Sequence, residues 1–341
     1  MATQHTTTAY NDLVNLIDLT IVDDNSSLKN EARMSGIFIS HNHPDGTGDT
    51  QRFEEFDVEL YAKAKNQASN ASTFRSQIGY SIDALIKRKG FNVEYSYEFK
   101  HYTKSQYEIV GKLTRGALEA EENRMDLDLQ HILSFAASTS YVNMDGETVS
   151  LAVGDTLALG STVHTLRSSA TTYRSRMANN PQYSTSALEL MMQSYSENGF
   201  NNFGQKKFRK ATHIFSTDNQ VVINAIRRDL HSTAGVTEIN SGVSNELKNV
   251  LQHVVLSKIA TDANGNVDTT KRNYWGILCA GQEGFQAYYA LNEAAHRDDT
   301  VDGASTYDVQ KDVWSIPFRI GYSIAVLSGR YFMYSSGDGT A

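Results

Sequence analysis

The chain has 341 residues, of which 40% are hydrophobic and 21% are charged, and its formal net charge at pH 7 is −8. Proteins that grip nucleic acid through its phosphates usually carry a strong basic patch, so this acidic balance argues against that class. The single cysteine, Cys279, excludes an intrachain disulfide, and the apolar run around it favours a buried, inert thiol.

The N-terminus lacks the basic start and apolar core of a secretory signal. No run approaches the roughly 20 apolar residues needed to cross a bilayer. We therefore expect no association with a membrane.

Residues 1–70 are rich in Thr, Asn, Asp and Ser, with short apolar patches at Leu13–Leu19 and Ile37–Ile39. Such a stretch has too little apolar surface to fold alone. We expect an extended N-terminal arm that becomes ordered by packing on another unit or another chain.

The segment Phe91–Phe99 alternates apolar and polar residues at a period of two, which predicts a strand with one apolar face. A second strand is expected at Tyr107–Val110, after a polar turn at Thr103–Gln106. Together they predict a projecting β-hairpin. It needs a partner surface, because two strands alone are marginal in water.

A long helix is expected over Gly116–Ala137, where apolar residues recur at helical spacing. Carboxylates fill its first half, where they meet the positive end of the helix dipole. A later helix, Ser186–Asn198, begins with Ser186 and Glu189 at capping-box spacing. Another helix follows a cap at Thr217 or Asp218.

Around Ser244–Leu256 the apolar spacing fits a helix, but the β-branched Val254 and Val255 make a strand an equal candidate. Asn264-Gly265 is a hairpin-turn signal. Further strands are expected at Ala211–Phe215, Tyr274–Ala280, Phe285–Leu291 and Trp314–Tyr334, with Pro317 favouring a sheet edge or a bulge. This mixture predicts an α+β fold with at least two packed units and extended arms.

Several long segments, in collinear order from Phe91 to the end, resemble tailed-bacteriophage major capsid proteins. They are Arg124–Phe135 (RMDLDLQHILSF), Ala170–Met191, Thr270–Gly276 (TKRNYWG), Asp312–Val326 (DVWSIPFRIGYSIAV) and Tyr334–Ala341 (YSSGDGTA). No short motif among them is diagnostic, so the resemblance rests on their length and order.

The resemblance implies the Hong Kong 97-type capsid fold. Its expected parts are an N-terminal arm at 1–70, an extended β-hairpin loop at 71–115, a peripheral domain with a long spine helix at 116–210, an axial domain at 211–305, and a return to the peripheral domain at 306–341.

It also implies a virion subunit that is not an enzyme and has no cofactor, catalytic residue or metal ligand. Such a subunit assembles in the host bacterial cytoplasm, as hexamers and pentamers, into an icosahedral shell around double-stranded DNA. The expected partners are other copies, a portal protein, a scaffolding protein in trans, and packaged DNA through weak non-specific contacts. A decoration protein is left open. An encapsulin-like compartment shares the fold and is the non-enzyme alternative, although the long polar arm favours a viral shell.

The main chemical alternative is a zinc site. His41-Asn42-His43-Pro44 resembles the HNHP stretch of JAMM-type metalloproteases, since two imidazoles two residues apart can share one Zn²⁺. Glu54 stands at the spacing of the third ligand, and Glu31 is the only upstream candidate for the base. Too few residues precede the pair for the sheet that carries that base, so a polar loop rich in histidine is the preferred interpretation.

A calcium loop is a weaker alternative. Asp262, Asn264, Asn266 and Asp268 have the opening spacing of such a loop, but Val267 stands where the tight turn needs glycine. A plain hairpin turn is preferred. The short basic clusters at 87–89 and 206–210 are interpreted as solvated surface.

Overall fold

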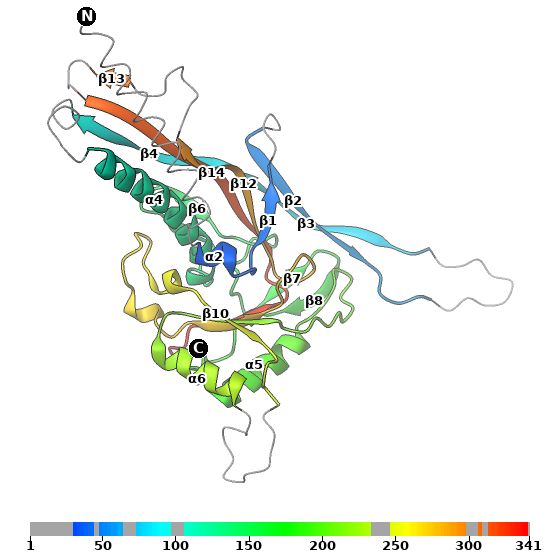
Figure 1. The fold of residues 1–341 in the computed structure, drawn as a ribbon. Coiled ribbons are helices and arrows are strands. Elements are labelled where there is room, and N and C mark those ends of the chain that lie inside the picture. Colours follow the sequence, from blue (N-terminus) through cyan, green and yellow to red (C-terminus); the bar gives the residue numbers. More distant parts are fainter. Residues whose placement is uncertain are drawn as a thin grey trace, which may run out of the picture.

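The computed structural model describes residues 30–43, 48–63, 73–96, 106–232, 246–297, 306–308 and 313–339. Within these ranges the chain has a mixed α+β fold built around two sheets, with a long two-stranded hairpin leaving the body on one side (Figure 1). No helix in these ranges is both long enough and apolar enough to span a membrane.

The larger sheet has five strands and carries β14, the longest strand among the described residues. Its strands run in the order β1, β12, β14 and β13, and β4 also pairs with β14. Their bounds are β1 Ile39–Asn42, β4 Lys87–Ser96, β12 Gln286–Arg297, β13 Thr306–Asp308 and β14 Val313–Ser328.

Pro317 lies in β14 opposite Asn92 of β4. On the other side of β14, pairing with β12 stops at Phe318 and pairing with β13 stops at Ser315. Proline has no N–H to donate to a sheet, and this gap in the pairing accommodates it. Within the described residues, Pro317 therefore has a strand partner on one side only, which agrees with the expected sheet edge or bulge.

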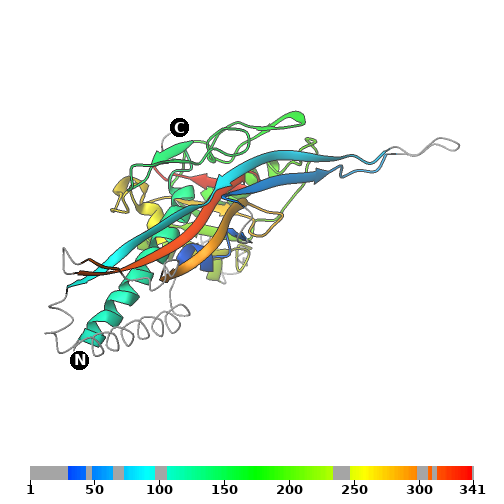
Figure 2. The ribbon, with the colours of Figure 1, turned by 90° about the horizontal axis from the view of Figure 1, so that it is seen from above.

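A 29-residue helix, α4 (Gln106–Ser134), lies along one face of this sheet (Figure 2). At 1.5 Å per residue it is about 44 Å long. Its stripe of Leu118, Met125, Leu129 and Ile132 is buried in one core with Phe318, Ile320 and Tyr322 of β14. The predicted helix is thus confirmed in its body, but it begins ten residues earlier than expected.

The short segment Tyr107–Val110 was expected to be a strand, and that prediction is wrong, because these residues belong to the first turns of α4. A run of four residues does not distinguish a strand from a helix by periodicity. Gly111 and Gly116 lie inside the helix, and each costs it only about 1 kcal/mol relative to alanine.

The smaller sheet has four strands in the order β10, β9, β11 and β15. Their bounds are β9 His213–Ser216, β10 Gln252–Val255, β11 Trp275–Leu278 and β15 Phe332–Ser335. Alternate residues face opposite cores, as the two-residue period of a strand requires. Phe215, Leu278 and Phe332 join the core under α4, whereas Ile214 and Ile277 join a second core under two helices.

Those helices are α5 (Thr185–Glu197) and α6 (Gln220–His231), and both were expected. Their N-caps differ from the predicted residues: Ser184 precedes the predicted Ser186, and Asn219 follows the predicted Thr217 or Asp218. Ser184 accepts a hydrogen bond from the backbone of Ala187, and Asn219 accepts one from Val221. The ambiguous segment near Val254 is a strand, β10, and Asn264-Gly265 forms the expected turn, with Gly265 at φ +80°.

The remaining described elements are short. They are α2 Glu31–Met34, β5 Ser140–Val142, β6 Thr148–Ser150, β7 His164–Leu166, β8 Ser169–Tyr173, and two 3₁₀ helices at Ser257–Ala260 and Thr269–Lys271.

The described part of the N-terminal segment packs on other parts of its own chain. Residues 1–29 lie outside the described residues. After them, Ala32, Ile37 and Phe38 are buried in the core under α4, and β1 pairs in parallel with β12. Asp126 of α4 accepts a 2.7 Å hydrogen bond from the backbone N–H of Ala32. Of the two possibilities expected for this segment, another unit or another chain, residues 30–43 thus pack on other parts of their own chain and complete its core.

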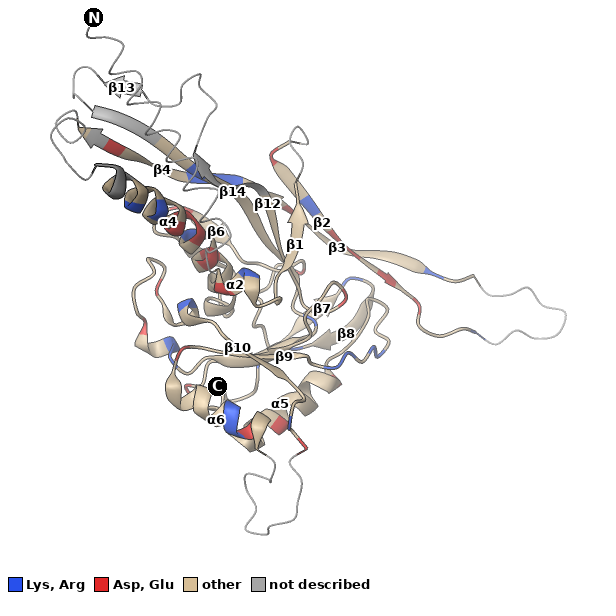
Figure 3. Ribbon diagram, in the orientation of Figure 1, with Lys and Arg blue, Asp and Glu red and all other residues tan. Residues whose placement is uncertain are grey.

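A buried carboxylate fastens α4 to the sheet. Asp128 forms an ion pair with Lys89 of β4 at 2.8 Å and accepts hydrogen bonds from Tyr322 at 2.6 Å and Tyr141 at 3.4 Å, with Arg124 beside it. Figure 3 shows acidic residues along α4 and basic residues on the neighbouring β4. Burial alone would raise the pKa of Asp128, but Lys89, Tyr322 and Arg124 lower it below the usual 3.8.

This pairing predicts a pH dependence of the free energy of unfolding. Since the folded pKa of Asp128 is depressed, its contribution is complete above about pH 4 and is lost as the pH falls through the folded value. Replacing Asp128 by asparagine is expected to cost about 3 kcal/mol near neutral pH, because Lys89 loses its 2.8 Å ion pair and keeps only the longer contact with Asp145 at 3.8 Å. Urea unfolding at pH 7 and pH 3 checks both points. Equal stability of the two proteins at pH 7 would contradict this role.

Candidate functional site

The candidate site is the hairpin made by β2 (Thr50–Val58) and β3 (Ser76–Leu85). Its strands are antiparallel, from the pair Thr50 and Leu85 at the base to the pair Val58 and Ser76. Both ribbon views show it projecting far from the two sheets (Figures 1 and 2). Because two strands alone are marginal in water, the hairpin depends on what its two faces contact.

At the base, the inward face packs on the larger sheet. Phe53 is buried and stacks on Tyr288 of β12 with ring centroids 4.7 Å apart. Ala84 of β3 and Leu327 of β14 complete this small core. The base is therefore held by ordinary apolar burial.

Beyond Phe53 the same face carries charge in place of apolar side chains. Glu55 and Asp57 are 2% and 6% exposed, and both form ion pairs with Arg330, which is 5% exposed. Burial lowers the pKa of Arg330 to about 10, so the guanidinium stays protonated at neutral pH. Asn202 donates its side-chain amide to Glu55 at 2.7 Å and its backbone N–H to Asp57 at 3.1 Å.

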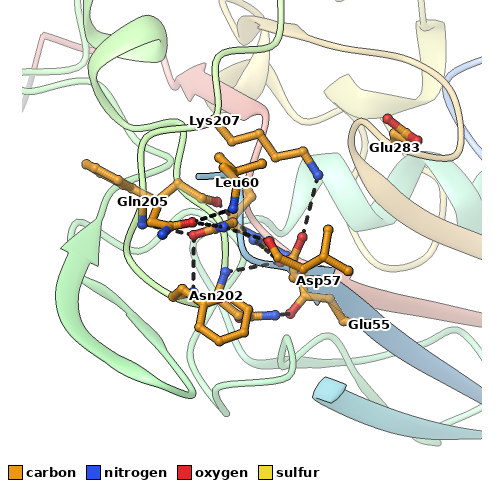
Figure 4. Close-up of polar contacts among 12 residues, drawn as sticks. Glu55, Asp57, Leu60, Asn202, Gln205, Lys207 and Glu283 are labelled. Carbon is orange, nitrogen blue, oxygen red and sulfur yellow. Dashed lines mark hydrogen bonds and ion pairs between the residues drawn. The ribbon is translucent and has the colours of Figure 1, made fainter. Parts of the chain in front are cut away.

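A loop at 199–207 makes further polar contacts with the hairpin toward its tip, which Figure 4 shows. Lys207 pairs with Asp57 at 3.5 Å, and Gln205 accepts a 2.8 Å hydrogen bond from the backbone N–H of Leu60. The loop also bonds the carbonyl oxygen of Val58 through Asn201. These bonds fix the direction in which the hairpin leaves the body.

Gly79 of β3 makes this close approach possible. A Cβ at this position would lie 2.3 Å from both the Glu55 carboxylate and the Asn202 amide. The backbone carbonyl of Gly79 also accepts a hydrogen bond from Arg167. The two strands and the loop at 199–207 thus meet around a residue without a side chain.

Beyond the ion pair of Arg52 with Glu54 on its exposed side, the hairpin carries large apolar side chains that no other described part of the chain covers. Phe56 and Ile78 are directly opposite each other in the register and are 65% and 52% exposed. Nearer the tip, Tyr61 and Phe74 are 62% and 63% exposed. Large apolar side chains gathered on one projecting element mark an interaction surface. We call these four residues the hairpin apolar face.

The sequence placed the projecting hairpin elsewhere, at Phe91–Phe99 with Tyr107–Val110, and this prediction is wrong. The described part of the first segment, Phe91–Ser96, does form a strand, but it belongs to β4 and pairs with β14, with Phe91 opposite Phe318. Residues 97–99 lie outside the described residues. The second is helical. The hairpin lies earlier in the chain, across the boundary between the expected arm and the expected extended loop.

The histidine pair does not form a zinc site. His43 is buried, and its two ring nitrogens lie 2.9 Å from the side-chain oxygen of Gln51 and 2.9 Å from the carbonyl oxygen of Gly48. Glu54 pairs with Arg52, and Glu31 accepts hydrogen bonds from Ser257. His43, Glu54 and Glu31 are thus engaged with other groups of the protein, and the ring of the exposed His41 packs edge-on against Phe53 and Tyr288.

A Ser-His-Asp arrangement, which the sequence did not reveal, lies in the body. His164 contacts Asp155 and Ser175 at 2.9 Å each, in the order that hydrolases use. However, His164 and Ser175 are fully buried, and Ser175 donates its hydroxyl to the carbonyl oxygen of Leu159. With no exposed surface at the serine, no substrate reaches it, so this arrangement is a buried hydrogen-bond network.

Ordinary structural contacts also account for the candidate calcium loop and the basic clusters. Asp262 accepts hydrogen bonds from the backbone of Asn264 and Asn266, which is the pattern of a turn. Among the basic clusters, Lys87 pairs with Glu147 and Arg209 pairs with Glu283. Across the described ranges no three metal-binding side chains gather at one place.

Cys279 is half-buried, and burial raises the pKa of its thiol. A raised pKa keeps the sulfur protonated at neutral pH, where the thiolate is the reactive form. The structure thus agrees with the expectation of an inert thiol.

No protein-family model and no curated protein matches the chain in sequence. Solved structures do match it. A chain of the capsid of Myoviridae phage XM1 is 11% identical, with a TM-score of 0.50, over 89% of this chain and 91% of that one. Structures from Microbacterium phage Oxtober96 (10% identity, TM-score 0.49, 90% of each chain) and Mycobacterium phage Patience (9%, 0.49, 96% and 86%) are also similar. The chain therefore shares its α+β fold with a subunit of a phage capsid.

Proposed function

We propose that this chain is the major capsid protein of a tailed bacteriophage, a non-enzymatic subunit that assembles into the shell of the virion. The observation that carries the proposal is the hairpin apolar face. It lies on an element that ion pairs hold rigidly to the body, and it is left open to solvent in the single subunit. The fold shared with the XM1 capsid supports the same conclusion.

In this proposal, hexamers and pentamers close into an icosahedral shell, because each contact joins two different surfaces and the rotations between copies close. The hairpin at 50–85 takes the part of the extended loop, α4 that of the spine helix, and the smaller sheet with α5 and α6 that of the axial domain. A portal protein, a scaffolding protein in trans and a decoration protein are proposed partners, and packaged DNA touches the inner wall only weakly.

Shortening the hairpin tests the proposal. Val58 and Ser76 are register partners, so residues 59–75 can be replaced by Asn-Gly, which favours a two-residue turn. We expect a folded subunit that forms no particles, because the anchor around Arg330 remains while the tip is lost. Circular dichroism and negative-stain microscopy of the purified variant give the two results. Normal shells from this variant would contradict the proposed role of the hairpin.

A further inference from the structure

The solvent side of α5 combines carboxylates with an exposed leucine. Glu189, Gln193 and Glu197 follow one another at intervals of four residues and, with Leu190, lie on one side of the helix. All four side chains are exposed, Leu190 to 59%. Glu197 accepts a hydrogen bond from Gln193, but neither carboxylate forms an ion pair with any described residue. We call these four residues the α5 acidic face.

Glu197 also occupies an unfavourable place on its own helix. It is the last residue of α5, and the last turn contains no basic residue. The C-terminus of a helix carries partial negative charge, so a carboxylate there is destabilising and a cation is stabilising. A local rule that is broken without compensation in the subunit points to a function. A cation from a second chain supplies that compensation.

The complementary chemistry lies at the far end of the hairpin. Tyr61 and Phe74 are 62% and 63% exposed, and Lys63 and Arg75 are exposed beside them. Lys63 has only a long ion pair with Glu59, at 3.7 Å, and the side chain of Glu59 is 12% exposed. Among the described residues, the accessible charge at this end is therefore mainly positive. We call the two aromatic and two basic residues the hairpin end.

Other carboxylates beside exposed apolar residues are already paired within the subunit. Asp145 pairs with Arg124 at 2.7 Å, and Asp268 pairs with Lys271 at 3.8 Å. The hairpin of the same chain does not cover the α5 acidic face either, because Leu190 stays exposed and both ribbon views show the hairpin leading away from the body (Figures 1 and 2).

We propose that, in the assembled shell, the hairpin end of one copy docks on the α5 acidic face of a second copy. The proposal rests on the proposed function, which brings many copies together. The two cations of the hairpin end pair with the two carboxylates, and the two aromatic rings cover Leu190. Because the two surfaces differ, the contact is heterologous and continues from copy to copy until a ring closes.

A structure of the wild-type shell at side-chain resolution tests the contact directly. We expect a side-chain nitrogen of Lys63 or Arg75 of a neighbouring copy within about 4 Å of a Glu189 or Glu197 oxygen, the limit for an ion pair. A shell in which the α5 acidic face is covered only by solvent, or by another part of a neighbouring copy, overturns the proposal.

Exchanging the charges tests whether the contact drives assembly. One variant carries Glu189→Lys and Glu197→Lys, and the other carries Lys63→Glu and Arg75→Glu. All four side chains are exposed, so we expect both subunits to fold, which circular dichroism checks. Each variant is expected to form about tenfold fewer shells than wild type, because two ion pairs in every contact become repulsive. Combining all four substitutions restores opposite charges and is expected to recover most of the yield.

The variant Glu119→Lys is the matched control, because it reverses an exposed carboxylate on α4, and we expect it to assemble normally. Normal yields from both reversed variants overturn the inference. So does a combined variant that forms no more shells than the poorer of the two. In either case a wild type that assembles leaves the proposed function in place, whereas a wild type without shells overturns that function as well.

Discussion

Replacing Arg330 by methionine is expected to lower the free energy of unfolding by about 3–5 kcal/mol and to abolish particle formation. Arg330 is the single guanidinium between Glu55 and Asp57, and all three side chains are at most 6% exposed. Removing it leaves the buried Glu55 carboxylate without a cation, and Asp57 keeps only the longer ion pair with Lys207 at 3.5 Å. The hairpin then loses its fixed direction as well as its stability. Urea unfolding of the purified subunit measures the first effect, and electron microscopy the second.

Two further variants distinguish the loss of the buried ion pairs from a general sensitivity of the hairpin to substitution. Arg52→Met removes an ion pair with Glu54 at 2.7 Å on the exposed side, where such pairs contribute at most about 1 kcal/mol. The triple variant Glu55→Gln, Asp57→Asn and Arg330→Met removes the buried charges together and is expected to recover part of the loss. A loss below about 1 kcal/mol for Arg330→Met alone would show that the buried pairs do not anchor the hairpin.

Placing aspartate at both Phe56 and Ile78 is expected to leave the subunit folded and to eliminate shells. The two side chains are opposite each other on the solvent side of the hairpin and are 65% and 52% exposed, so their replacement removes little buried contact within the subunit. In the proposed shell, however, two carboxylates would be buried against a neighbouring copy without partners, at a cost of several kcal/mol per ion. Sedimentation velocity and thermal unfolding give the two readouts.

Val267→Asp is the control for this pair of substitutions. Val267 is 83% exposed and lies in the turn after Gly265, far along the chain from the hairpin. It introduces the same type of charge on an exposed apolar residue, and we expect shells to form in normal yield. If the Phe56 and Ile78 variant also assembled normally, the hairpin apolar face would have no part in assembly.

The sequence predicted those elements whose signals are local. The apolar stripe of α4, the capped helices α5 and α6, and the turn at Asn264-Gly265 all depend on residues a few positions apart, and all are present. The strand at Phe91 was also correctly identified. Its partner was not, because β4 pairs with β14 more than 200 residues later, and strand pairing at that separation leaves no trace in local periodicity.

The hairpin was missed for a different physical reason. An amphipathic strand shows alternation between an apolar buried face and a polar exposed face. In β2 this is partly reversed, because Glu55 and Asp57 are buried while Phe56 is exposed. The reversal is explained by Arg330, which pairs with both acids and lies more than 250 residues later in the chain. An exposed apolar residue on a polar strand is in turn what an assembly surface requires.

For the N-terminal segment, the sequence suggested less order within the subunit than the structure has. Its low apolar content suggested an arm without a core of its own. Three buried side chains, Ala32, Ile37 and Phe38, together with the hydrogen bond from Ala32 to Asp126, are enough to hold residues 30–43 in the subunit. Few apolar residues suffice here because the core that they complete is already built by α4 and β12. Composition averaged over 70 residues could not reveal this.

Negative-stain electron microscopy of the purified full-length chain, alone and with a candidate scaffolding protein, tests the proposal that copies bury one another's hairpin apolar face. We expect closed, icosahedral particles of uniform size whose walls are one subunit thick. Monodisperse single subunits at every concentration and in both preparations would contradict the account.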